Sequence, residues 1–70
     1  MRVFSDLTSH YYDTHDAVRI MNTKQAGKYI KHGVYPKDIM WEEDLNTLVF
    51  VFNKAESKEL YEKWKSYDLE

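Results

Sequence analysis

Residues 48–52 read Leu-Val-Phe-Val-Phe, an unbroken run of five apolar side chains. That length suits a β-strand and is too short for a stable helix, and β-branched and aromatic residues favour the pleated backbone. In a strand, Leu48, Phe50 and Phe52 lie on one face, and Val49 and Val51 lie on the other. Because both faces are apolar, we predict a central strand whose larger side chains meet the main core, with Phe50 deeply buried.

The residues before this run predict the other half of a β-hairpin. Residues 38–42 alternate in character, with Ile39 and Trp41 on one face and Met40 on the other. Residues 43–47, Glu-Asp-Leu-Asn-Thr, have the composition of a turn. The two strands are therefore expected to be antiparallel.

A further strand and a helix are predicted upstream. Residues 17–21 alternate in the manner of a strand. Asn22 or Thr23 is then expected to cap a helix, and Asn22 with Gln25 has the spacing of a capping box. Gly33 supplies the left-handed residue that ends this helix. Its buried face is predicted from the helical period, and its members are Ala26, Tyr29 and Ile30.

A last helix is expected after the central strand. Asn53 with Glu56 three residues on, or else Ser57, has the position of its N-terminal cap. The apolar stripe of this helix follows the same period. Its members are Leu60, Tyr61, Trp64 and Tyr67.

These elements predict an α+β fold in the order β-α-β-β-α. The fold has a three-stranded antiparallel sheet with the strand at 48–52 in the centre, and both helices cover its Leu48/Phe50/Phe52 face. Residues 17–70 form this single domain. Residues 1–16, rich in turn-forming side chains, are expected to be a partly ordered N-terminal arm.

The Val49/Val51 face then needs a cover, because a bare apolar strip on a small domain favours association. Met40, together with Arg19 or Met21, should flank the two valines. Either the N-terminal arm or a second protein could supply the cover, and we favour the arm. Its apolar candidates are Phe4, Leu7, Tyr11 and Tyr12.

Length and composition exclude several classes of protein. Seventy residues predict one domain, and the absence of cysteine excludes disulfides and thiolate zinc sites. A cytoplasmic setting fits that absence, and no apolar run approaches the length of a membrane span. We expect no cofactor and no metal, although His10, Asp13, His15 and Asp16 lie close in sequence. No serine lies in a nucleophile-elbow pattern, so we expect no enzyme.

The chain resembles a small uncharacterised domain family of bacteriophages and mobile elements of Gram-positive bacteria. The resemblance covers residues 18–67 and rests on residues 23–33 (Thr-Lys-Gln-Ala-Gly-Lys-Tyr-Ile-Lys-His-Gly), on residues 48–52, and on Leu60 and Trp64. It implies the β-α-β-β-α layout and a mobile-element setting, with the host cytosol as location. It implies no catalytic residues.

The leading functional hypothesis is a non-enzymatic protein-binding module. The hairpin and its border carry aromatic side chains of the kind that anchor interfaces, and acids that can imitate phosphate charge. A host nucleic-acid-binding or defence protein, inhibited through this acidic hairpin, is therefore a suitable target. The expected partner-binding residues are Tyr35, Trp41, Glu42, Glu43 and Asp44.

The alternative is a small DNA-binding accessory or regulatory protein. Lys24, Lys28 and Lys31 recur at i, i+4 and i+7 and would lie on one face of the first helix, where they could track phosphates. The net charge of −2 and the lack of arginine on that helix weigh against it. A structural homo-oligomer is the third possibility.

Overall fold

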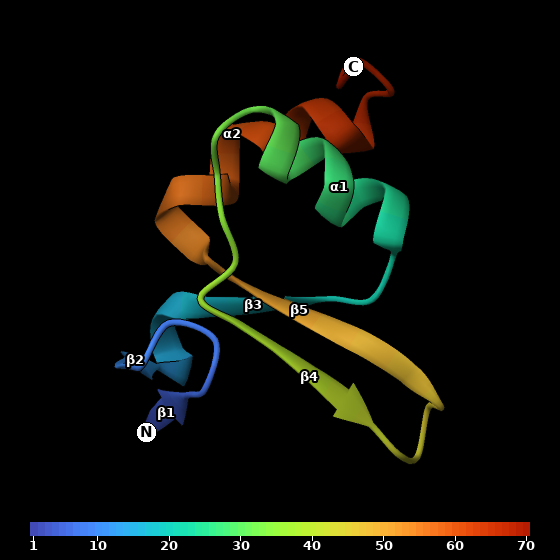
Figure 1. The fold of residues 1–70 in the computed structure, drawn as a ribbon. Coiled ribbons are helices and arrows are strands. Elements are labelled where there is room, and N and C mark those ends of the chain that lie inside the picture. The colour runs from blue at the N-terminus through green and yellow to red at the C-terminus, as the bar shows by residue number, and fades with distance from the viewer.

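The computed structural model describes residues 1–70 and has the α+β fold predicted from the sequence (Figure 1). One antiparallel sheet has the strand order β3-β5-β4, and both helices lie on one side of it; a second, two-stranded sheet of β1 and β2 lies on the other side. In chain order the elements are β1 (Arg2–Ser5), β2 (His10–Asp13), a 3-10 turn (Thr14–Asp16), β3 (Ala17–Ile20), α1 (Thr23–Lys31), β4 (Asp38–Glu42), β5 (Thr47–Asn53) and α2 (Lys54–Lys65).

Strand β5 is central, as predicted, and pairs with both neighbours. Phe52 is fully buried and meets Tyr29 of α1 edge to face, with ring centroids 5.0 Å apart. The surrounding core consists of Ile20, Ala26 and Leu69. Phe50 is only partly buried, contrary to expectation, because the helices pack over the Phe52 end of the strand and leave the other end open.

Both helices begin where the sequence indicates, and α1 also ends there. Asn22 Oδ1 accepts a hydrogen bond from the Gln25 amide at 3.1 Å, and Asn53 Oδ1 accepts one from the Glu56 amide at 3.0 Å. Each bond satisfies an amide that the helix itself leaves unpaired. Gly33 follows α1 with φ +86°, the left-handed conformation that glycine adopts without strain.

The faces of the helices differ in part from the predicted stripes. On α1, Ile30 is exposed and Gln25 is buried instead, because its side chain donates to the Tyr29 hydroxyl at 2.8 Å. On α2, Leu60 and Trp64 pack against the core, but Tyr61 is exposed. Tyr67 lies beyond the end of α2 and is almost wholly exposed.

The first residues form a β-hairpin that the sequence did not reveal. β1 and β2 pair with Val3 opposite Tyr12 and Ser5 opposite His10. One carboxylate fastens this hairpin to the start of β4: the Ser5 hydroxyl donates to Asp38 Oδ1 at 3.2 Å, and the Tyr12 hydroxyl donates to Asp38 Oδ2 at 3.0 Å. Ser5 and Asp38 are both buried.

The hairpin lies against the Val51 end of the second sheet face. Val3 and Tyr12 share a hollow with Met40 and Val51, so the arm does approach this face. The other expected side chains do not cover it: Phe4, Leu7 and Tyr11 are exposed. Phe4 and Tyr11 sit opposite one another and pack edge to face on the outer side of the hairpin.

Further along, an ion pair crosses the same face. Val49 is fully buried and lies opposite Met40, the predicted flanking residue. Arg19 on β3 and Glu42 on β4 flank β5 from its two sides, and their side chains meet at 2.9 Å. Long side chains of this kind cover apolar surface with their methylene stems.

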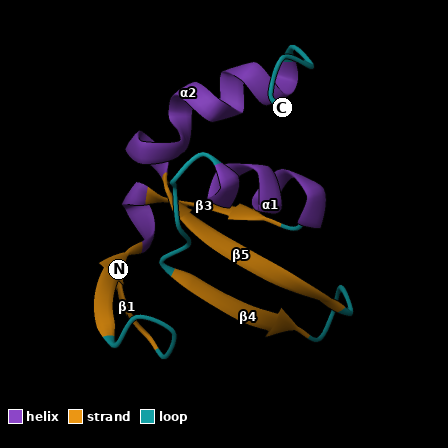
Figure 2. Cartoon of the chain, turned by 45° about the horizontal axis from the view of Figure 1, so that its top comes forward, coloured by secondary structure: helices purple, strands orange, loops and turns teal.

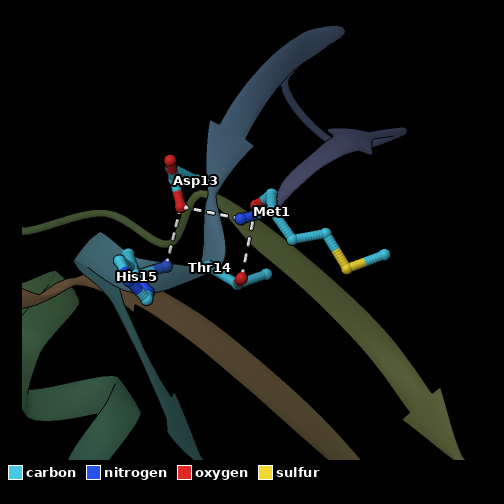
Figure 3. Close-up of polar contacts among 4 residues, drawn as sticks. All are labelled: Met1, Asp13, Thr14 and His15. Atoms are coloured by element: carbon cyan, nitrogen blue, oxygen red, sulfur yellow. Dashed lines mark hydrogen bonds and ion pairs between the residues drawn. The ribbon is translucent and has the colours of Figure 1, made fainter.

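The chain turns from β2 into β3 around a single carboxylate (Figure 3). Asp13 Oδ1 accepts from the His15 amide at 2.8 Å and from the Met1 ammonium at 3.3 Å, and the Thr14 hydroxyl donates to the Met1 carbonyl at 3.2 Å. The His15 amide, followed by the terminal ammonium, holds the pKa of Asp13 below its usual value because both stabilise the ionised form.

Candidate functional site

Two apolar side chains are exposed near the turn of the β4–β5 hairpin. Trp41 on β4 lies directly opposite Leu48 on β5, and the two are 51% and 41% exposed. They share the sheet face of Phe50 and Phe52, on which the helices pack. β4, however, is the edge strand farthest from the helices (Figure 2). We call these two residues the Trp41–Leu48 patch.

The adjoining turn carries the acidic residues. Residues 43–46 form a tight turn in which the Asn46 amide donates to the Glu43 carbonyl at 3.2 Å and Asn46 adopts φ +51°. Glu43, Asp44 and Leu45 are all exposed. Two free carboxylates therefore lie next to the patch in the chain. We call residues 43–46 the acidic turn.

The five predicted partner-binding residues do not form one surface. Glu42 projects to the opposite sheet face from Trp41, since neighbouring side chains in a strand alternate, and it is engaged with Arg19. Tyr35 is exposed in the loop between α1 and β4. The structure thus keeps Trp41, Glu43 and Asp44 at one end of the hairpin and adds Leu48, which had been assigned to the core.

The predicted lysine stripe is divided. Lys24 and Lys31 are exposed, but Lys28 is half-buried. The Lys28 ammonium donates to the Leu69 carbonyl at 2.8 Å and lies 5.7 Å from the centre of the Trp64 ring. Lys24 and Lys28 line a hollow with residues of α2 and the segment after it, from which Lys31 is absent.

Sequence reasoning missed the lysines of α2 that continue this basic surface. Lys54, Lys58, Tyr61 and Lys65 recur at i, i+4, i+7 and i+11, a spacing that places them on one flank of the helix. The spacing was visible, but the sequence alone did not show that this flank adjoins α1 and β3.

The half-buried Tyr12 and the fully buried Tyr29 have raised pKa values. Burial raises the pKa of Tyr12, and the bond to Asp38 adds to the rise because an ionised phenol would face a carboxylate. Burial also raises the pKa of Tyr29, partly opposed by the hydrogen bond from Gln25. Both phenols therefore stay neutral to a higher pH than an ordinary tyrosine, with Tyr29 packed in the core and Tyr12 attached to Asp38.

The polar residues near the N-terminus line a hollow without converging on one point. His10, Asp13 and Asp16 border it together with Lys37. No three side chains of histidine, aspartate or glutamate come together in a geometry that could hold a metal ion. The Asp13 carboxylate is instead occupied by the two backbone donors described above.

Comparison of the chain with protein-family models, with curated proteins and with solved structures found no match. Neither helix has the length and apolar character needed to cross a membrane.

Proposed function

We propose that this protein is a non-catalytic binding module that docks on a partner protein through the Trp41–Leu48 patch and the acidic turn. The observation that supports this most directly is the exposure of Trp41 opposite Leu48 on an otherwise packed sheet face. Tryptophan is among the residues that contribute most to protein interfaces, where its large ring fills a pocket and excludes water. Exposed acids at the rim of such an anchor steer association and fix orientation.

The partner that fits this surface has an apolar pocket beside a basic rim. Glu43 and Asp44 present two carboxylates that form no ion pair within the protein. Surfaces that bind nucleic acid are basic, so a host nucleic-acid-binding or defence protein is the partner class that we propose. Occupation of its basic surface by the acidic turn would then compete with phosphate.

A co-purification with matched variants tests the proposal. The Trp41→Ser/Leu48→Ser double variant removes the patch, and Leu7→Ser is its control because Leu7 is similarly exposed but lies in the β1–β2 turn. From nuclease-treated host lysate, the wild type and the Leu7 variant should retain the same protein, and the double variant should not. Equal retention by the double variant would refute the proposed site.

A second pair of variants separates the two parts of the surface. Glu43→Lys/Asp44→Lys reverses the charge of the acidic turn but keeps the patch. With a purified partner, this change should slow association, and Trp41→Ser should mainly speed dissociation. An association rate that does not respond to the charge reversal would exclude a basic partner.

A further inference from the structure

A groove beside α2 gathers basic side chains from three elements. Two adjoining hollows share Tyr61: one lies between β3 and α2, and the other lies between α1, α2 and the residues after α2. Six of the ten basic residues of the chain line these hollows, and none of the twelve acidic residues does. The six are Arg19, Lys24, Lys28, Lys54, Lys58 and Lys65. We call this surface the lysine–tyrosine groove.

The six cations of the groove are not equally free to meet a ligand, since Arg19 is paired with Glu42 at 2.9 Å and the Lys28 ammonium donates to the Leu69 carbonyl at 2.8 Å. Lys24, Lys54 and Lys58 take part in none of the four ion pairs of the structure. Lys65 lies 3.5 Å from Glu62, but both side chains are more than half exposed, and exposed pairs of this kind contribute little. The chain as a whole has a net charge of −2. The positive charge of the groove therefore reflects the arrangement of the fold and not the composition.

Aromatic rings stand among the cations. Tyr61 is 44% exposed at the junction of the two hollows, and the Lys65 ammonium lies 5.2 Å from the centre of its ring. Trp64 and the exposed Tyr67 border the second hollow. A ring face that accepts a cation also accepts the face of a nucleobase, and such stacking does not depend on base identity.

We propose that the lysine–tyrosine groove binds single-stranded nucleic acid, with its lysines on the phosphates and Tyr61 stacked on a base. This goes beyond the proposed function, because it uses other residues at the other edge of the sheet. Alternating basic and aromatic groups are the common device of proteins that bind single strands without sequence preference. An acidic peptide would be attracted by the lysines, but its carboxylate side chains have no planar ring to stack on Tyr61. A duplex would keep its bases stacked away from the ring.

Fluorescence anisotropy with the full chain tests this proposal. The probes are labelled oligothymidylate and oligouridylate of about 15 nucleotides, within the usual site sizes of such proteins. We expect both to bind. If four lysines neutralise phosphates, affinity should fall about fiftyfold between 50 and 200 mM salt, from the single-strand slope of roughly 0.7 per contact.

Charge-matched double variants locate the site. Lys58→Glu/Lys65→Glu should weaken binding about 25-fold at roughly 0.1 M salt, the effect expected for two lost phosphate contacts. Lys31→Glu/Lys63→Glu makes the same change in net charge at exposed positions outside the groove and should retain most of the affinity. All four side chains are exposed, so both variants should fold, which circular dichroism checks. Equal losses in the two variants would overturn the proposal.

The aromatic contribution needs its own variant. Tyr61→Leu keeps an apolar side chain but removes the ring, and it should cost about tenfold in affinity, the size of one base–aromatic stack. Trp64 fluorescence, measured in a Trp41→Phe background, should be quenched on binding. Unchanged affinity for Tyr61→Leu, or equally tight binding of duplex DNA or of polyglutamate, would show a general polyanion surface and refute a single-strand site.

Discussion

The attachment of the N-terminal hairpin predicts a selective effect of Tyr12→Phe. This change removes only the hydroxyl that donates to Asp38 at 3.0 Å. Hydrogen bonds to charged groups contribute about 1.5–3 kcal/mol, and the half-buried position of Tyr12 places this one near 1.5 kcal/mol. A domain of 70 residues has a free energy of unfolding of roughly 4–10 kcal/mol. We therefore expect Tyr12→Phe to lose a large fraction of the free energy of unfolding and to melt about 6–12 °C lower.

Tyr11→Phe is the matched control. Tyr11 is the neighbouring residue, and its side chain lies on the outer face of the hairpin, where its hydroxyl makes no hydrogen bond within the protein. Urea melts followed by tryptophan fluorescence should show a loss for Tyr12→Phe only. A cycle with Asp38→Asn should give a coupling of about 1 kcal/mol. Equal stability of the two phenylalanine variants would refute the attachment.

The raised pKa of Tyr12 adds a pH signature to the same experiment. Because burial and the bond to Asp38 favour the neutral phenol in the folded state, the stabilisation is complete below the ordinary tyrosine value of about 10. It is lost as the pH rises through the higher pKa of the folded state. Tyr29 and the lysines also titrate in this range, so the informative quantity is the difference between wild type and Tyr12→Phe. That difference should shrink at alkaline pH.

Three further predictions concern stability. Phe52→Ala should cost about 3–5 kcal/mol and abolish cooperative melting by circular dichroism, because Phe52 is fully buried at the helix–sheet interface; a melt with an unchanged midpoint would contradict the core described above. Gly33→Val should cost more than about 1 kcal/mol, and Gly33→Asn distinctly less, since asparagine tolerates positive φ; equal urea midpoints for the two would argue against the left-handed conformation. The pKa of Asp13 is lowered in the folded state, so the stability that its carboxylate contributes is fully present above about pH 3.8 and is lost as the pH falls through the lower folded-state pKa. Acid unfolding of Asp13→Asn should lack that part of the transition.

The elements from residue 17 onward could be predicted because local signals agree with the fold. Asn22 and Asn53 cap helices by bonds to residues three positions on, and Gly33 ends a helix through its own φ angle. The central strand follows from an apolar run that no other element could bury. These features depend on contacts close in sequence, or on one dominant apolar segment.

The N-terminal hairpin was not predicted because the residue that holds it in place lies far away in the sequence. β1 and β2 are four residues each, and their inner faces include Ser5 and His10 as well as apolar residues. The group that orders them is Asp38, which lies 33 residues from Ser5 and 26 from Tyr12. A buried carboxylate needs hydrogen-bond donors, but the sequence does not say which segment supplies them.

Exposure was the least predictable property of the candidate sites. Whether Trp41 and Leu48 are core or surface depends on how far the helices extend over the sheet, which their periodicity does not specify. The same holds for Tyr61, which satisfies the apolar period of α2 yet faces solvent among lysines. In both cases an apolar residue at the margin of a predicted core is the one that forms the candidate site.

The two proposed surfaces lie at opposite edges of one sheet. The Trp41–Leu48 patch belongs to the β4 edge, and the lysine–tyrosine groove begins at the β3 edge, with β5 between them. The two surfaces also carry opposite charge. Glu43 and Asp44 adjoin the patch in the chain, whereas the groove is lined by basic residues and by no acid. From these charges we expect a nucleic acid to be repelled from the edge proposed for a basic partner and attracted to the other. The two proposed surfaces share no residue, so each proposal can fail without the other.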